Sequence, residues 1–261
     1  MKKIRFFIYF LLIGLILTIT VEIIRFRHVI FPKHDFKYSY QSENLNLYSD
    51  ASLDSLQLQP FHQTTKFLKN HPLYRIENNY DIFLCTRQDN YSRIATKIKK
   101  GKMTQGLHIE PIDYNFLNLT FIQEVNQKTR DAFSNTLLAG DTSHVLLHEI
   151  THGLLADFSG WWSIRKIPNW KLEGYCEYAA TFSVEGMDTN KHYEKLMQNY
   201  LYGEMDQVAS GRILYIRASL ITWYCMEIEG MPLESFLSDN RPEAMMFQKS
   251  QEYWTSLQLQ Q

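Results

Sequence analysis

The chain has 261 residues, of which 45% are hydrophobic and 14% aromatic, so it can bury one core of domain size. Its formal net charge is -1 and it has no Lys/Arg-rich stripe interleaved with aromatic residues, so nucleic acid is not an expected partner. Three cysteines are too few for a disulfide framework, and none belongs to a CxxC motif for zinc or redox chemistry. We expect Cys85, Cys176 and Cys225 to be packed in the core.

The N-terminal segment begins with basic residues and continues as an apolar run from Phe6 to Val21. As an α-helix, the stretch from Phe6 to Ile24 would span about 28 Å, which just crosses a bilayer. No A-x-A cleavage site follows the run, so residues 1–27 are expected to form a cytoplasmic tip and an uncleaved transmembrane signal anchor. This predicts a single-pass membrane protein with its folded domain on the extracytoplasmic side.

A stalk is expected at residues 28–44, because this segment contains Pro32 and mixed charges without a clear hydrophobic period. The folded domain is then predicted to span residues 45–255. Residues 256–261 form a polar tail that we expect to be frayed.

The first part of the predicted domain has a β, α, β, β pattern. Residues 45–50 and 80–85 are rich in Leu, Tyr and Phe and are expected to be strands, with a helix at about 52–69 between them. The segments "GLHIEPI" and "LNLTFIQEV" (117–125) also alternate like strands. Because the chain after Asp141 is mostly helical in pattern, we expect an α+β fold with a small mixed sheet followed by a mainly helical half.

The segment "SHVLLHEITHGLL" contains two histidines, His148 and His152, at helical spacing. On a helix they lie on the same face, where both imidazoles can bind one ion. Glu149 is rotated about 100° from His148 and would lie beside the metal, as a base for a metal-bound water does. Three N-cap residues in a row, at 141–143, predict a helix that runs to about Asp157.

A hydrolytic zinc site has three protein ligands and an open position, so a third ligand is needed. The metzincin spacing is excluded, because Leu155 and Phe158 occupy the positions of its glycine and third histidine. Downstream, "NWKLEGYCEYAA" places Glu173 and Glu177 on one face of a second helix that starts after Pro168. One carboxylate can reach the metal while the other accepts the free ring N–H of a ligating histidine.

The segments "HEITH" and "WKLEGYCEY" resemble the gluzincin metallopeptidases, the thermolysin-like and M1-aminopeptidase-like group. The resemblance implies a zincin-like domain that carries the two motifs on separate helices and binds Zn²⁺. It implies the following roles: His148, His152 and Glu173 as metal ligands, Glu149 as the general base, and Glu177 as the partner that orients the first histidine.

Other residues near these motifs have two interpretations each. Tyr215 in "YIRA" is similar to the tyrosine that supports the oxyanion in M1-like members, but a core tyrosine is an equally good interpretation. His144 is either a fourth contact or a residue at the helix start. Trp161, Trp162 and Trp170 either line a substrate cleft or simply pack.

Three functions remain for comparison. The first is a membrane-anchored zinc metallopeptidase that hydrolyses peptide or protein substrates with a metal-activated water and Glu149 as base. The second is a non-catalytic membrane-anchored binding protein, which the intact Glu149 disfavours. The third, an intramembrane protease, needs the motif inside an apolar span of about 18 residues, and the sequence around His148 has no such span.

Overall fold

The structure is a computed structural model that describes residues 2–98, 104–109, 112–124, 142–184, 188–203 and 210–259. Its strands are β1 (Tyr38–Ser42), β2 (Leu45–Ser49), β3 (Tyr80–Cys85), β4 (Gly106–Ile109) and β5 (Tyr114–Asn118). Its longer helices are α1 (Lys2–Ile30), α2 (Ser55–Leu68), α3 (Gln88–Lys97), α5 (Thr142–Ser159), α7 (Asn169–Phe182), α8 (Thr189–Tyr202), α9 (Ser210–Trp223) and α11 (Glu243–Gln258). Short helices are α6 (Trp161–Ile164), α10 (Leu233–Ser238) and a helical segment at 119–124.

The five strands form one mixed sheet with the order β1-β2-β3-β5-β4. The two central pairs are parallel, whereas β1 and β4 pair with their neighbours in the antiparallel direction. The predicted α+β fold with a small mixed sheet is confirmed. Because β1 lies at residues 38–42, the sheet begins before the boundary near Leu45 that we expected.

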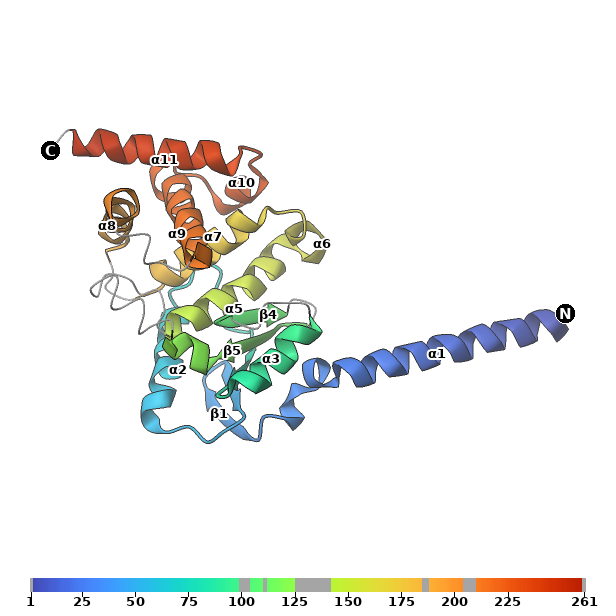
Figure 1. Cartoon of the computed structure of the whole chain (residues 1–261). Helices are drawn as coiled ribbons and strands as arrows, with labels where there is room; N and C mark the ends of the chain where they lie inside the picture. Colours follow the sequence, from blue (N-terminus) through green and yellow to red (C-terminus); the bar gives the residue numbers. More distant parts are fainter. Residues whose placement is uncertain are drawn as a thin grey trace.

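Helices cover both faces of the sheet (Figure 1). On one face, α2 and α5 pack against alternate strand residues such as Leu47, Ile82 and Leu117. On the other face, α3 and the last turn of α1 pack against residues such as Phe83 and Phe116. The buried side chains of the central strands point to opposite faces in turn, as expected for a sheet covered on both sides.

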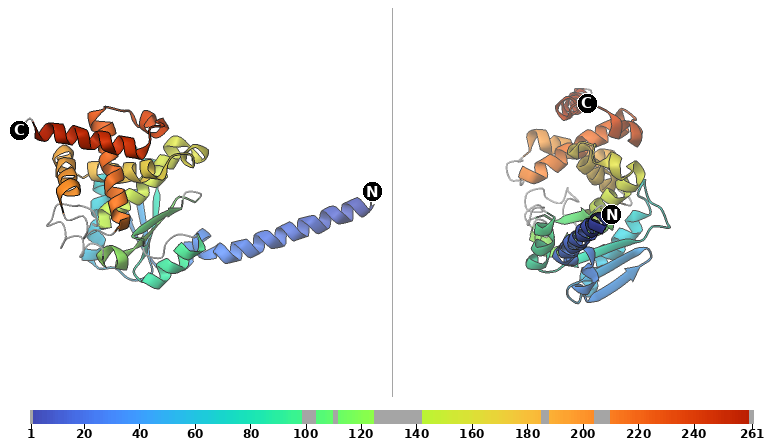
Figure 2. Two further views of the ribbon diagram at one scale, coloured as in Figure 1. Left: turned by 45° about the horizontal axis from the view of Figure 1, so that its top comes forward. Right: turned by 90° about the vertical axis from the view of Figure 1, so that its right-hand side faces the viewer.

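The second half of the chain is helical, as predicted. In Figures 1 and 2, α5 lies between the sheet and the group formed by α7, α9 and α11. A second core fills this helical group, with Tyr175, Leu220 and Trp223 fully buried among its members. The helix α5 is therefore covered from both sides, which explains why its polar side chains need partners inside the protein.

The prediction of a transmembrane anchor at residues 1–27 is wrong. Within the described part of the chain, no helix combines the length and apolar character that crossing a membrane requires. Residues 2–30 do form one long helix, but it carries Glu22 paired with Arg25 at 3.5 Å, and charges are costly in hydrocarbon. Its last turn belongs to the folded domain, because Val29 is buried against the sheet. The prediction of a single-pass membrane protein with an extracytoplasmic domain depended on this anchor and is wrong as well.

The strand expected at 117–125 is shorter and starts earlier. It is β5, which ends at Asn118, and residues 119–124 are helical. Val125 lies outside the described residues. The side-chain amide of Asn118 explains the end of the strand, because its Oδ1 accepts a hydrogen bond from the backbone N–H of Phe121 and so caps the turn that follows.

Candidate metal centre

The helix α5 presents both motif histidines on the face that is turned toward α7. Their rings lie 5.0 Å apart with an interplanar angle of 73°. The helix covers residues 142–159, close to its predicted extent, and Gly160 with a φ of 78° follows its last turn. A positive φ of this kind is the usual way to end a helix, and glycine adopts it without steric cost.

The helix α7 begins directly after Pro168, as predicted, and brings Glu173 to the two histidines. Glu173 Oε2 is 3.1 Å from His148 Nε2 and 3.5 Å from His152 Nε2. The three side chains predicted as ligands therefore lie next to one another.

Glu177 lies behind the first histidine. Its Oε1 is 3.3 Å from His148 Nδ1, a contact without full hydrogen-bond alignment. Its Oε2 is 2.9 Å from His144 Nε2, and Arg212 of α9 donates to both of its oxygens, at 2.6 and 3.0 Å. His144 thus contacts Glu177 rather than serving only as a helix-start residue, and Arg212 is a member of the site that the sequence did not indicate.

The charges in this cluster favour a bound cation. Burial lowers the pKa of His148, but the carboxylates of Glu173 and Glu177 raise it to about 10. Burial raises the pKa of Glu173, but His152 and His148 hold it well below its usual range. Likewise, Arg212 and His144 outweigh burial and depress the pKa of Glu177. Two ionised carboxylates thus flank His148, and in the metal-free chain a proton on this histidine supplies the positive charge. The residues present therefore fit a divalent metal.

Glu149 points from α5 toward the edge strand β4. It is buried, and a Cβ atom added to Gly106 would lie 2.4 Å from its Oε1 and 2.6 Å from its Cγ. The missing side chain of Gly106 is therefore what leaves room for this carboxylate.

The same strand places a third histidine beside the second ligand. His108 stacks on His152 with ring centroids 6.4 Å apart and an interplanar angle of 17°. Its Nδ1 donates to Asn115 Oδ1 at 3.0 Å, and burial lowers its pKa to about 4, so it is neutral. A Cβ at Gly153 would lie 3.0 Å from His108 Cε1, so this glycine permits the close packing of the ring on α5.

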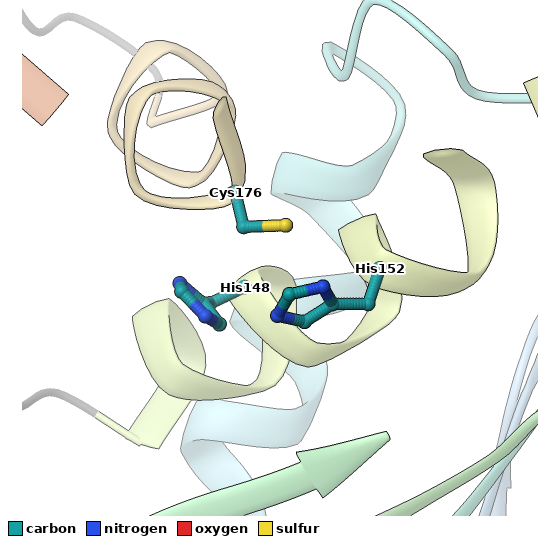
Figure 3. Close-up of side chains that lie close together, drawn as sticks. All are labelled: His148, His152 and Cys176. Atoms are coloured by element: carbon teal, nitrogen blue, oxygen red, sulfur yellow. The ribbon is translucent and has the colours of Figure 1, made fainter. Parts of the chain in front are cut away.

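Cys176 also faces the two histidines. Its Sγ and one ring nitrogen of each of His148 and His152 all lie within 4.8 Å of one another (Figure 3). It is fully buried, as expected for a core cysteine, but the sequence analysis assigned it no contact with the metal ligands. Two ligand sets are thus conceivable, with Glu173 or Cys176 as the third member. We favour Glu173, since its oxygen is within 3.5 Å of both histidines.

Tyr215 lies next to the first histidine, as the resemblance implies. Its ring centroid on α9 is 5.9 Å from that of His148, and the guanidinium of Arg212 lies 5.8 Å from its ring centre. Burial, together with the nearby carboxylates of Glu173 and Glu149, raises the pKa of the hydroxyl. The hydroxyl therefore keeps its proton at neutral pH and can donate a hydrogen bond.

Trp162 and Trp170 lie away from the predicted metal ligands. Trp162 is 74% exposed, and Trp170 packs edge-on against Phe236 with ring centroids 5.9 Å apart. Trp170 belongs instead to a separate cavity of about 660 Å³ between the α6–α7 connection and α10, where no predicted metal ligand is present. The side chain of Trp161 lies outside the description.

Gly174 lies where α7 meets α9. A Cβ at this position would lie 2.6 Å from the backbone oxygen of Ala218 and 2.5 Å from Thr222 Oγ1, both on α9. The glycine therefore serves the contact between α7 and α9, which in turn places Arg212 and Tyr215 at the candidate metal centre.

No protein-family model matches this chain, and no curated protein matches it. The resemblance to gluzincins stays a prediction that rests on the motif residues.

Proposed function

We propose that the chain is a zinc-dependent metallopeptidase of the gluzincin type. The observation that carries this proposal is the convergence of His148 Nε2 and His152 Nε2 on Glu173 Oε2, with Glu177 behind His148. A set of two histidines and one glutamate is a ligand set of hydrolytic zinc sites. This ligand chemistry supports zinc as the proposed metal.

In this proposal His148, His152 and Glu173 would hold a zinc ion, which would supply a Lewis acid to polarise the scissile carbonyl and to lower the pKa of water. The carboxylate of Glu149 accepts the proton of the attacking water and passes it to the leaving amine. Glu177 holds His148 with Nε2 directed at the ligand position, which fixes the tautomer. The neutral hydroxyl of Tyr215 donates a hydrogen bond to the oxygen on which negative charge develops.

The edge strand β4 is the best place for an extended peptide. The neighbouring strand β5 offers no free edge, because it is paired on both sides, with β3 and β4. Of the described strands next to α5, β4 is the one that ends the sheet, and it carries Gly106 against Glu149. A substrate that adds to this edge would bring its backbone past the proposed base.

The alternative function is a non-catalytic binding protein that retains the fold. A structural zinc does not need a general base beside its ligands. The room that Gly106 leaves for Glu149 therefore favours catalysis over binding alone.

Removal of zinc should abolish peptide hydrolysis. We expect the full-length chain to cleave an unfolded protein substrate, to lose this activity on dialysis against a chelator, and to regain it when one equivalent of zinc is added. The measurement is the initial rate of substrate cleavage before and after each step. Hydrolysis that survives complete removal of metal would contradict the proposal, and a zinc-loaded chain that cleaves no peptide would favour the binding protein.

Replacing Gly106 by alanine should displace the proposed base without unfolding the protein. The three atoms nearest to the new Cβ all belong to the side chain of Glu149, so the fold and the zinc content are expected to stay unchanged. A misplacement of about 1 Å costs roughly 100-fold in rate, and we expect a fall of this size in kcat/KM. Gly14→Ala is the matched control, because a Cβ there meets no atom within 4 Å. Unchanged kcat/KM in the Gly106 variant would contradict the assignment of Glu149 as the general base.

A further inference from the structure

The face of α7 that carries the third ligand carries a second metal-binding side chain. Cys176 follows Glu173 by three residues, so the two side chains lie on the same side of the helix. In Figure 3 the thiol projects from α7 into the space beside the two rings of α5. Its Sγ is within 4.8 Å of a nitrogen of each histidine, and the side chain is fully buried.

We propose that Cys176 is a fourth protein donor to the metal held by His148, His152 and Glu173, which gives the chain a closed resting state. On ligation the thiol releases its proton to solvent, and a sulfur lone pair forms the bond to the metal. Thiolate ligands select thiophilic ions such as zinc, cadmium and cobalt over magnesium, calcium and manganese. This inference rests on the proposed function, because it requires the metal site. It adds that the site prefers thiophilic metals and that it has a closed, inactive state.

A fourth protein ligand has a functional consequence. Zinc sites with four protein ligands are closed, whereas hydrolytic sites keep one position open for water or substrate. The thiolate therefore competes with water, and the hydrolytic state forms when the sulfur leaves the metal. Glu173 stays the third ligand in both states, since its Oε2 lies 3.1 Å from His148 Nε2 and 3.5 Å from His152 Nε2.

Cobalt substitution of the full chain tests this inference. A thiolate bound to cobalt(II) produces an intense near-ultraviolet charge-transfer band, whereas histidine and carboxylate ligands alone produce only weak visible bands. We expect the near-ultraviolet band in the natural chain and its loss in Cys176→Ala and in Cys176→Ser. Cys225→Ala is the matched control, because Cys225 is also fully buried and belongs to the same helical core, and this variant should keep the band.

Each other outcome overturns the inference in a different way. Visible cobalt bands without the charge-transfer band in the natural chain would mean that Cys176 is not a donor, while the proposed metallopeptidase remains intact. A band that persists in the Cys176 variants would assign the thiolate to another cysteine. A chain that binds no cobalt and no zinc would overturn the proposed function together with this inference. Because the natural chain alone can give the first and the third of these outcomes, the test does not depend on the folding of a variant.

Discussion

Glu173→Gln is expected to empty the metal centre, whereas Glu177→Gln is expected to leave it filled with a lower affinity. Glu173 Oε2 is the oxygen that both histidine Nε2 atoms face, at 3.1 and 3.5 Å. Glu177 contacts His148 only through the far ring nitrogen. Loss of a direct ligand removes a bond to the metal, but loss of the residue behind a ligand typically costs about 10 to 100-fold in affinity or activity.

Bound zinc per chain after dialysis is the measurement that separates the two variants. Glutamine is used at both positions because removal of the Glu177 side chain would leave Arg212, bound to it at 2.6 Å, without its partner in a buried place. Such a broken pair destabilises a protein by about 3–5 kcal/mol and would confuse the comparison. If the Glu177 variant proves to be the empty one, the assignment of the two carboxylates is reversed.

Glu149→Gln is expected to retain zinc and to lose nearly all hydrolysis. The amide has the shape of the carboxylate and fits the space beside Gly106, but it cannot accept the proton of a water molecule. General-base catalysis contributes about 10²–10⁴-fold, so kcat is expected to fall by a factor in this range. The measurement is kcat for a peptide substrate, with bound zinc determined on the same sample.

Glu194→Gln provides the matched control for the base, because Glu194 is an exposed glutamate on α8 and its replacement should leave both quantities unchanged. Loss of zinc in the Glu149 variant would show that this residue is a ligand. Full activity in that variant would assign the base to another group.

Local sequence patterns predicted those parts of the site that depend on a single helix. Helical spacing alone placed His148 and His152 on one face of α5, and Pro168 marked the start of α7. Compositional runs predicted β2 and β3 within one residue of their ends. These features depend on neighbours that are close in sequence, so the sequence contains most of the information that determines them.

Contacts between distant segments were not predictable in the same way. Nothing near Gly106 in the sequence indicates that it faces Glu149 of α5, and Arg212 reaches Glu177 only because α9 packs on Gly174. Cys176 was treated as a core residue, although its spacing of three residues from Glu173 was a signal for the shared face. The transmembrane prediction rested on the apolar run from Phe6 to Val21, whereas the described part of the chain contains no helix that is long and apolar enough to cross a membrane.

The most direct test of the central claim is the zinc content of the full-length chain purified without chelators. The account predicts one zinc ion per chain in the natural protein and none in the His148→Ala/His152→Ala double variant, measured by elemental analysis after gel filtration. His34→Ala/His62→Ala is a control with the same number of histidines removed away from the site, and it should retain the ion. A natural chain that contains no metal after zinc has been supplied, or a double variant that still holds one zinc ion, would contradict the account.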